Sequence, residues 1–339
     1  MSYTNSISAA ESAKFTSCPD WRTYYTSAVN QFSNVEAFVN NSDSKIIAEN
    51  VIFTGNVDID FDLKCQVEFI NCYFKGFIYF TKSKYEGRIA FTRCFCDDQF
   101  IVEKDLEFLD NLDIIQLTVA KQVLIRGGKY GECNWSFLSG ATVKINGGNF
   151  KRLSLGYWGG MHINDLTIDV NKVTGQLQII DSKTKIEKFL LVGTSVDLSI
   201  SISDVEITSF TVAYFKMSDR LRIDNIKTIS GSGQSSLIAI IGSYLKDSEF
   251  NSINFSNYTD VYFYESQFTE CLWTNIQWKG QVWVTKSPTV GMTGDEKEWL
   301  STVKRFDRAF SQDKYLSRKL RKRQPVREYY FKKREIIDS

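Results

Sequence analysis

Hydrophobic residues return along the middle of the chain in a six-residue pattern. Phe69-Ile70-Asn71-Cys72-Tyr73-Phe74 is the first clear example, and Phe91 opens a second one 22 residues later. Each example has an apolar residue, two polar or small residues, an apolar or small residue, any residue, and a final apolar residue. Further examples, most of them 16 to 23 residues apart, open at Ile125, Ile145, Ile163, Ile186, Ile202, Phe250 and Trp273, with imperfect ones at Ile47 and Ile223.

This pattern predicts a short strand, a corner and a second short strand. Apolar residues that alternate along a strand lie on one face, which marks the buried side. Asn and Asp bend the backbone through hydrogen bonds to nearby amides. These and other small polar residues occupy the middle positions in Asn164-Asp165, Asp224-Asn225, Asn251-Ser252 and Thr274-Asn275. Successive units would stack like on like, so we expect Phe69 to lie next to Phe91 and Cys72 next to Cys94.

Two longer gaps interrupt the series. The intervals from Phe91 to Ile125 and from Ile223 to Phe250 indicate inserted loops or turns that the pattern misses. Proline, which cannot donate to a β-ladder, is absent between Pro19 and Pro288. The sequence therefore predicts a mainly β protein, a right-handed parallel β-solenoid over residues 45–287.

The segment 67–95 also resembles a degenerate pentapeptide repeat. That family places a central Phe or Leu every five residues, with a small residue two positions before it. The residues that follow this spacing are Phe69, Cys72, Phe74, Phe80 and Tyr85. The resemblance implies the same topology class as a general right-handed β-helix, so both alternatives remain open at this point.

The two ends of the chain depart from the pattern. A solenoid exposes unpaired strand edges at its ends, so caps are expected there. Residues 1–44 carry spaced apolar residues from Trp21 to Phe38 and predict a helical N-terminal cap. Residues 288–339 predict an α-helical appendage, because Thr293 and Glu296 form a capping box. Apolar residues then follow at helical spacing, namely Trp299, Val303, Phe306 and Phe310.

Charge is concentrated in this C-terminal segment. Residues 304–335 hold 13 of the 41 Lys and Arg residues but 4 of the 40 Asp and Glu residues, so the remaining chain is acidic. Such a run favours an anionic surface, whether nucleic acid, lipid or an acidic protein, and it also suits docking on the chain's own acidic body. The predicted partner-binding residues are Arg318, Lys319, Arg321, Lys322 and Arg323.

Cysteine usage and hydropathy bear on location. Seven cysteines, an odd number, fit reduced thiols better than a disulfide framework. No run approaches the roughly 18 to 20 apolar residues that span a bilayer. Residues 1–14 lack the apolar core of a secretory signal. We therefore expect a cytoplasmic protein, unless a leader has been removed.

Several side chains are candidates for chemistry, each with a structural interpretation. His162, the only histidine, has no sequence-near partners that would form a catalytic triad. Cys94 and Cys96 lack the paired spacing of structural zinc, so we expect core stacking and neither a metal nor another cofactor. Core and cap packing is the expected role of most aromatics near the end of the coil, namely Tyr262, Tyr264, Trp273, Trp278 and Trp283.

Carboxylates provide the main enzymatic alternative. Asp58, Asp60 and Asp62 alternate along one strand face, and Asp97 and Asp98 follow a corner. Carbohydrate-active β-helix enzymes use Asp pairs, and glycosidases need two carboxyl groups about 5 to 10 Å apart. No Asp pair recurs at the spacing of the pattern, so solvated, non-catalytic carboxylates are expected.

The sequence thus favours a non-enzymatic scaffold that binds a protein partner or a second copy of itself through its coil faces and basic tail. A polysaccharide lyase or hydrolase and a fibre-like or tailspike-like structural protein are the alternatives, because one scaffold carries many functions.

Overall fold

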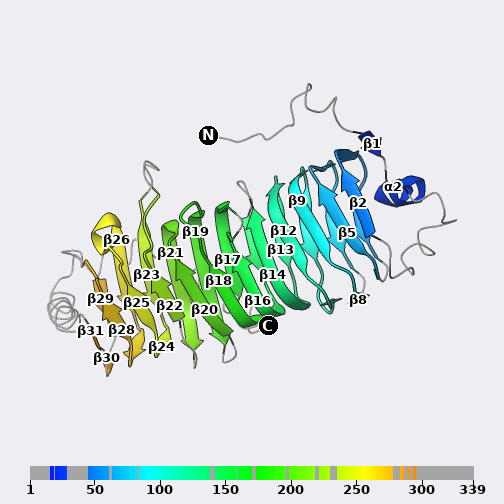
Figure 1. Ribbon diagram of the computed structural model, residues 1–339. Coiled ribbons are helices and arrows are strands. Elements are labelled where there is room, and N and C mark those ends of the chain that lie inside the picture. Colours follow the sequence, from blue (N-terminus) through cyan, green and yellow to red (C-terminus); the bar gives the residue numbers. More distant parts are fainter. Residues whose placement is uncertain are drawn as a thin grey trace.

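The computed structural model describes residues 16–18, 20–28, 45–60, 63–81, 84–137, 142–157, 159–169, 173–195, 198–217, 221–229, 235–277, 283–285, 289–290 and 293–294. These residues form a parallel β-solenoid of about nine turns with almost no helix, which confirms the predicted mainly β class. The strands stack along one long axis, from β2 at one end to β31 at the other (Figure 1). The handedness of the coil remains a prediction.

Two parallel sheets, here called sheet A and sheet B, hold the described strands. Sheet A contains β1 (Thr16–Cys18), β2 (Lys45–Glu49), β3 (Val51–Phe53), β5 (Gln66–Ile70), β6 (Tyr73–Phe74), β8 (Lys84–Tyr85), β9 (Ile89–Cys96), β11 (Glu107–Phe108), β12 (Leu112–Val119), β14 (Lys129–Phe137), β16 (Gly148–Leu155), β18 (Val173–Ile179), β20 (Leu198–Ser203), β22 (Leu221–Asp224), β25 (Glu249–Asn251), β28 (Leu272–Thr274) and β31 (Thr293–Gly294). Sheet B contains β4 (Val57–Ile59), β7 (Ile78–Phe80), β10 (Gln99–Val102), β13 (Gln122–Ile125), β15 (Thr142–Ile145), β17 (His162–Asp169), β19 (Lys185–Ser195), β21 (Glu206–Met217), β23 (Leu237–Ile241), β24 (Tyr244–Lys246), β26 (Asp260–Tyr264), β27 (Gln267–Thr269), β29 (Trp283–Thr285) and β30 (Thr289–Val290).

One column of inward residues runs through sheet A from turn to turn. Phe69 pairs in register with Phe91, and Phe91 pairs with Ile114. At the other end Ile223 pairs with Phe250, which pairs with Trp273. All these side chains are buried, as are the other predicted inward residues Ile145, Ile163 and Ile202. The predicted like-on-like stacking is therefore confirmed.

After this column the backbone bends at residues with positive φ. The conformation recurs at Asn50, Asn71, Arg93, Gln116, Asp181, Asp204, Asn225, Ser252 and Asn275. Asn and Asp enter this region more readily than other non-glycine residues, because their short polar side chains bond locally. The corner residues also bond to one another between turns, since Asn225 Nδ2 donates to Asp204 Oδ1 at 2.7 Å. These bends bring each second strand back with its apolar residues inward.

The six-residue pattern occurs at three structurally different positions within a turn. The sequence analysis had assigned all its examples to one kind of corner. Ile125 and Ile145 end strands of sheet B and precede corners at Gly128 and Gly148. The corner predicted at Asn164-Asp165 is wrong, because both residues lie within β17. In that strand Ile163 and Leu166 are both buried, three positions apart. One extra residue in a strand thus gives the same apolar spacing as a corner.

The two long gaps have different causes. Ile114, Leu117 and Val119 of β12 match the pattern. The interval from Phe91 to Ile125 therefore contains a turn that the sequence analysis did not recognise. In the second gap Ile223 of β22 pairs directly with Phe250 of β25. The extra residues there form an insertion between consecutive turns.

Stacked aromatic rings fill much of the interior between the sheets. Phe69 and Phe91 stack at 4.9 Å between ring centroids, and Phe250 and Trp273 stack at 4.1 Å. A longer column joins rings from four turns at 4.8, 4.9 and 4.4 Å, namely Tyr85, Phe108, Tyr130 and Phe150. Offset stacking adds roughly 0.5–1.5 kcal/mol per pair beyond the burial of apolar area.

At the N-terminal end, helix α2 (Trp21–Ala28) lies against the first turn (Figure 1). Trp21 is buried, and its Nε1 donates to the Asp58 carbonyl at 3.1 Å. The Tyr24 hydroxyl donates to the Ile47 carbonyl at 2.8 Å. Strands of the two sheets also lie in both predicted caps, because β1 pairs with β3, β30 with β27, and β31 with β28. Thr293 and Gly294, where the C-terminal helix was expected to begin, form β31 instead. Apart from Asp20, the other residues of the predicted caps lie outside the described residues. The division at residues 44/45 and 287/288 remains a prediction.

The number of residues per turn tests the resemblance to pentapeptide repeats. In sheet B, Val57 pairs with Ile78, Phe100 with Val123, and Phe210 with Ile238. A strict five-residue repeat would separate register partners by a multiple of five, and these separations are 21, 23 and 28 residues. The solenoid class is therefore shown, and the pentapeptide identity is not.

The positive φ of Arg93, 52°, gives a test of the corner. Replacing Arg93 with Val should lower the free energy of unfolding by about 1–2 kcal/mol, because a branched Cβ clashes in this conformation. Arg93→Gly should change it by less than about 1 kcal/mol, since relief of strain offsets the added chain entropy. Urea unfolding checks both changes, with Thr92→Val in the adjoining strand position as the control. Equal effects of Val at positions 92 and 93 would contradict the assigned corner.

Candidate interaction surface

The outward side of sheet B carries one unbroken column of side chains along the solenoid. Register pairs join its members in the order Asp58, Tyr79, Ile101, Leu124, Lys144, Thr167, Leu190, Thr211, Ala239 and Tyr262. Strands alternate their side chains, so these residues point away from the core that their neighbours fill. We call this side of the molecule the outer wall. Neighbouring strands lie about 4.8 Å apart, which brings the members of the column into contact.

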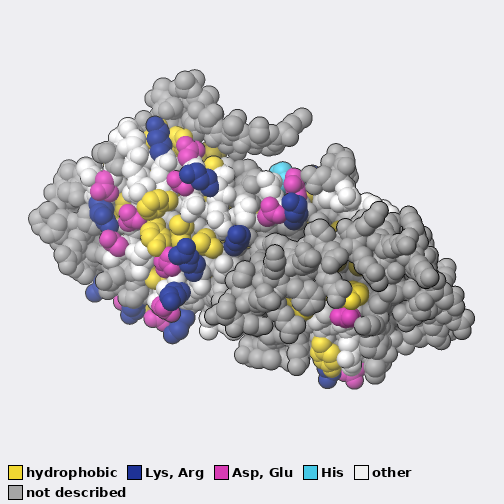
Figure 2. Space-filling view, turned by 180° about the vertical axis from the view of Figure 1, so that it is seen from behind, with side chains coloured by type: hydrophobic (Ala, Val, Ile, Leu, Met, Phe, Trp, Pro, Cys, Tyr) yellow, Lys and Arg dark blue, Asp and Glu magenta, His cyan; other side chains and the backbone are white. Residues whose placement is uncertain are grey.

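The N-terminal half of the outer wall carries an apolar patch, which we define as Phe77, Tyr79, Ile101 and Leu124. All four side chains are partly exposed. The rings of Phe77 and Tyr79 meet edge to face at 5.9 Å. Figure 2 shows hydrophobic side chains gathered on this side of the molecule with charged side chains around them. Single apolar residues are common on monomer surfaces, whereas large contiguous apolar patches are typical of contact sites.

Two ion pairs lie beside the patch. Arg126 binds Glu103, whose Oε1 also accepts from the Tyr79 hydroxyl at 2.7 Å. Lys121 Nζ lies 2.9 Å from Asp98 Oδ1. Exposed pairs of this kind contribute little stability, about 0–1 kcal/mol. The two pairs carry no net charge, and Asp58 and Lys144, the register neighbours of Tyr79 and Leu124, are of opposite type at the two ends of the patch.

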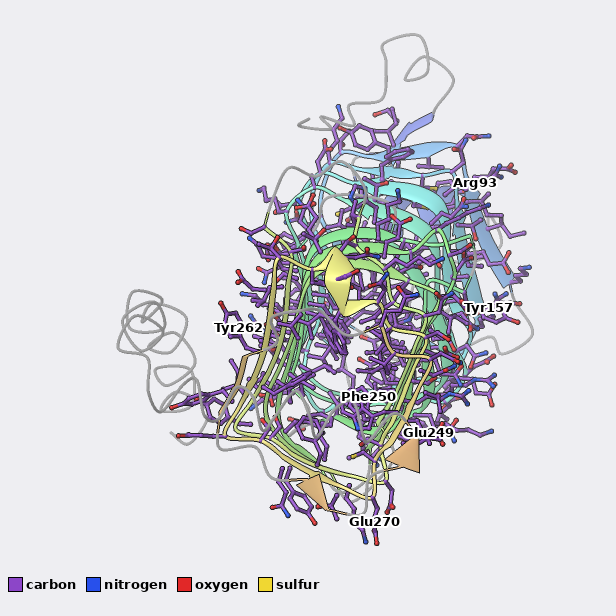
Figure 3. The ribbon with its side chains drawn as sticks, turned by 90° about the vertical axis from the view of Figure 1, so that its left-hand side faces the viewer. Arg93, Tyr157, Glu249, Phe250, Tyr262 and Glu270 are labelled. Carbon is purple, nitrogen blue, oxygen red and sulfur yellow. The ribbon has the colours of Figure 1, made fainter. Side chains whose placement is uncertain are left out.

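The C-terminal half of the outer wall carries a different set, the buried stripe, which we define as Leu190, Val192, Thr211, Ala213 and Ala239. Register pairs connect them across β19, β21 and β23. Leu190, Val192 and Ala213 form a hydrophobic cluster separate from the main core. Figure 3 looks along the solenoid and places Tyr262 on this wall, Glu249 on the opposite wall, and Phe250 between them.

The carboxylates predicted to be non-catalytic are engaged with other groups where the structure describes them. Asp60 pairs with Arg22, and the Tyr73 hydroxyl donates to Asp97. Burial raises the pKa of Asp58, and Arg22 partly offsets that rise. Asp98 belongs to the pair with Lys121. Asp62 lies outside the described residues, so the alternating Asp set is only partly visible.

The other candidate residues fall in separate places. His162 begins β17 and pairs in register with Lys185. Trp273 is buried, and Tyr262 and Tyr264 are partly exposed on β26. The Tyr262 hydroxyl donates to Asp260 Oδ1 at 3.0 Å. Trp278 and the side chain of Trp283 lie outside the described part of the chain.

All seven cysteines are buried and free of disulfides. Cys72 Sγ donates to the Ala48 carbonyl at 3.2 Å, and Cys94 Sγ donates to the Phe69 carbonyl at 3.3 Å. The two bonds repeat one geometry on successive turns, and the Cys72 side chain contacts Cys94. The predicted stacking of these two residues is therefore confirmed. Within the described ranges no three His, Cys, Asp or Glu side chains gather as a metal would require.

The sequence interpretation expected contacts on the coil faces in general, but it named contact residues only in the basic run 318–323 and did not identify the outer wall. That run lies outside the described residues, so its role remains a prediction. Ile101 and Leu124 each alternate with buried residues in short strands, which is a weak signal. Their alignment depends on coil lengths that the sequence pattern did not fix.

Comparison with known proteins does not assign a function to this arrangement. No family model, no curated protein and no solved structure matches the chain. Among the described helices none has the length and apolar character needed to cross a membrane. The functional argument therefore depends on the outer wall itself.

Thiol chemistry tests the cysteine assignment. Burial raises the pKa of Cys96 and of Cys133 to about 12, and that of Cys65 and of Cys271 to about 11. The thiolate is the reactive form, so these residues should react at least about 100-fold more slowly at pH 8 in the native protein than in urea. Mass spectrometry after alkylation measures the rate at each cysteine. Fast native labelling of any of the four would contradict core stacking.

Proposed function

We propose that this protein is a non-enzymatic interaction scaffold whose outer wall binds a protein partner at the apolar patch. The single observation that carries the proposal is the register of Tyr79, Ile101 and Leu124 on three successive turns. A ladder of backbone hydrogen bonds holds their strands, so the patch is preorganised. Preorganised side chains lose little entropy on binding, which favours affinity.

The chemistry of the patch favours a protein over a nucleic acid. Binding of a phosphate backbone depends on Lys and Arg side chains that replace its counterions. At the rim, Lys121 and Arg126 are engaged with Asp98 and Glu103. Apolar area with an aromatic residue that also carries a polar group is typical of protein interface cores. A partner with a complementary apolar surface fits these features, and a second copy of this chain is one such partner.

The basic C-terminal run would add a second contact. We infer that Arg318, Lys319, Arg321, Lys322 and Arg323 bind an acidic surface of the same partner. Thirteen basic residues lie within residues 304–335, while the remaining chain is acidic. Such a contact would speed association and would weaken as salt rises, because the Debye length falls from about 10 Å at 0.1 M to about 3 Å at 1 M.

A charge placed in the patch tests the first contact. Ile101→Glu should weaken partner binding or self-association at least about tenfold, because an unpaired carboxylate would be desolvated in the contact. The solenoid should keep its thermal stability within a few degrees, since position 101 points outward. Sedimentation velocity measures self-association, and quantitative mass spectrometry compares the proteins that co-purify from the native cell.

Gln176→Glu, an exposed position in β18 of sheet A, is the matched control for charge. It should leave binding unchanged. Retention of every partner and of the oligomeric state by the Ile101 variant would exclude the patch as the contact.

Neutralisation of the basic run tests the second contact. Changing Arg318, Lys319, Arg321, Lys322 and Arg323 to Gln should lower affinity for the purified partner at least about tenfold at 0.1 M salt and little at 1 M. The control replaces two exposed solenoid lysines, Lys104 and Lys227, with Gln. Affinity that stays constant in both salts would contradict the proposal. Loss of nucleic-acid or lipid-vesicle binding, with partner binding intact, would reassign the run to those ligands.

A further inference from the structure

The first five members of the outward column on sheet B have a self-complementary order. They are Asp58, Tyr79, Ile101, Leu124 and Lys144, which register pairs join across β4, β7, β10, β13 and β15. All five side chains are partly exposed. An acidic residue lies at one end and a basic residue at the other, with three apolar or aromatic residues between them. The same order in reverse therefore places a complementary residue opposite each position.

We propose that two copies of this chain pack their outer walls face to face, with the two solenoids antiparallel. The inference rests on the proposed function, because it uses the same apolar patch, and it names a second copy as the partner. A two-fold axis along β10 would relate the copies, with Ile101 on the axis. Contacts across such an axis are reciprocal. Tyr79 of each copy would therefore face Leu124 of the other, and Asp58 of each would face Lys144 of the other.

The two end charges favour this orientation over the other two-fold arrangement of the walls. An axis along the solenoid would bring the two Asp58 carboxylates together and the two Lys144 ammonium groups together. Like charges that face each other across a contact disfavour it, whereas opposite charges fix its register. Lys144 has no ion-pair partner among the described residues, and Arg22, the cation beside Asp58, pairs with Asp60. Both end charges are therefore available to a second copy.

The outward residues beside Ile101 also suit a two-fold axis along β10. A residue on the axis meets its own copy, so its chemistry has to complement itself. Gln99, the outward position before Ile101, has an amide that both donates and accepts hydrogen bonds. Glu103, the outward position after it, is paired with Arg126 of its own chain. The two Glu103 carboxylates would lie near the axis with an Arg126 beside each, so this group of four charges has no net charge.

The extent of the contact predicts a weak dimer. Three outward positions on each of five strands face the second copy, which is fewer than the roughly 20 to 30 residues a side of a standard interface. The overlap cannot extend further along sheet B, because β4 is the edge strand of that sheet among the described strands. Beyond Lys144, each outer wall would extend away from the contact. We therefore expect a dissociation constant in the micromolar range or above.

Charge reversal tests the contact, because positions 58 and 144 cannot touch within one chain. Four strand spacings of about 4.8 Å separate them, roughly 19 Å in all. At about 0.1 M salt, Lys144→Glu should raise the dissociation constant of the dimer at least about tenfold, since carboxylates would then face each other at both ends of the contact. Asp58→Lys added to the same chain should restore the constant to within about threefold, because opposite charges face each other again. Sedimentation velocity measures both changes.

Lys64→Glu is the matched control for the reversal of a lysine. Lys64 is exposed and follows Leu63, which forms a bridge with Tyr85 of sheet A, so it lies in the same part of the solenoid but off the outer wall. This variant should leave the dissociation constant unchanged.

A chemical cross-link tests the orientation without reversing either charge. One sample carries Asp58→Cys, a second carries Lys144→Cys, and a short bismaleimide is added to each sample and to their mixture. The mixture should give a cross-linked dimer, because the two new thiols face each other. Each sample alone should give at least about tenfold less, since its two thiols would lie roughly 19 Å apart along the solenoid. The seven native thiols are buried and should not react.

The outcomes separate this inference from the proposed function. A protein that stays monomeric up to its solubility limit would overturn the dimer, as would a double variant as weak as Lys144→Glu alone. A link within the Asp58→Cys sample as strong as that of the mixture would overturn the antiparallel orientation. If the double variant does not fold, the cross-link alone decides. In each of these cases the patch would still bind another protein if Ile101→Glu loses partners that co-purify, and the proposed function fails only if that variant keeps them all.

Discussion

The register between successive turns is the constraint on which the rest of the structure depends. Each turn gives its backbone hydrogen bonds to the next, so every inward side chain meets the equivalent side chain one turn away. Phe69 stacks on Phe91, and Phe250 stacks on Trp273. A slip of one residue would turn the apolar residues outward, which makes the register strongly specified. Positive-φ corners such as Asn71 and Asn225 keep it from turn to turn.

The same register shapes the surface. Outward residues align as strictly as inward ones, so a column on sheet B joins Tyr79 to Tyr262 along the molecule. In one half its members form an exposed apolar patch with paired charges at the rim. In the other half its members are largely buried, and Tyr214 of β21 packs against the cluster of Leu190, Val192 and Ala213. The scaffold function that we propose would use the exposed half of this wall for the contact with a partner.

The class of fold was predictable from the sequence because the spacing of buried apolar residues repeats from one turn to the next. Phe69, Phe91 and Trp273 fall where the pattern places them, and all are buried. Asn164-Asp165 misled the interpretation, because an extra residue in β17 gives the apolar spacing of a corner. The apolar patch was not predictable, since Tyr79 and Leu124 are 45 positions apart in the sequence. Their alignment depends on the exact length of two intervening turns, which composition and periodicity do not determine.

Disulfide mapping on the outer wall tests this register most directly. Ile101 and Leu124 are register partners in a parallel sheet, so their Cα atoms lie within the roughly 4.4–6.8 Å that a disulfide spans. The double variant Ile101→Cys and Leu124→Cys should form this bond under mild oxidation while the seven native thiols stay reduced. A pair two turns apart, Ile101→Cys with Lys144→Cys, should not form one. A bond in the second pair and none in the first would contradict the account.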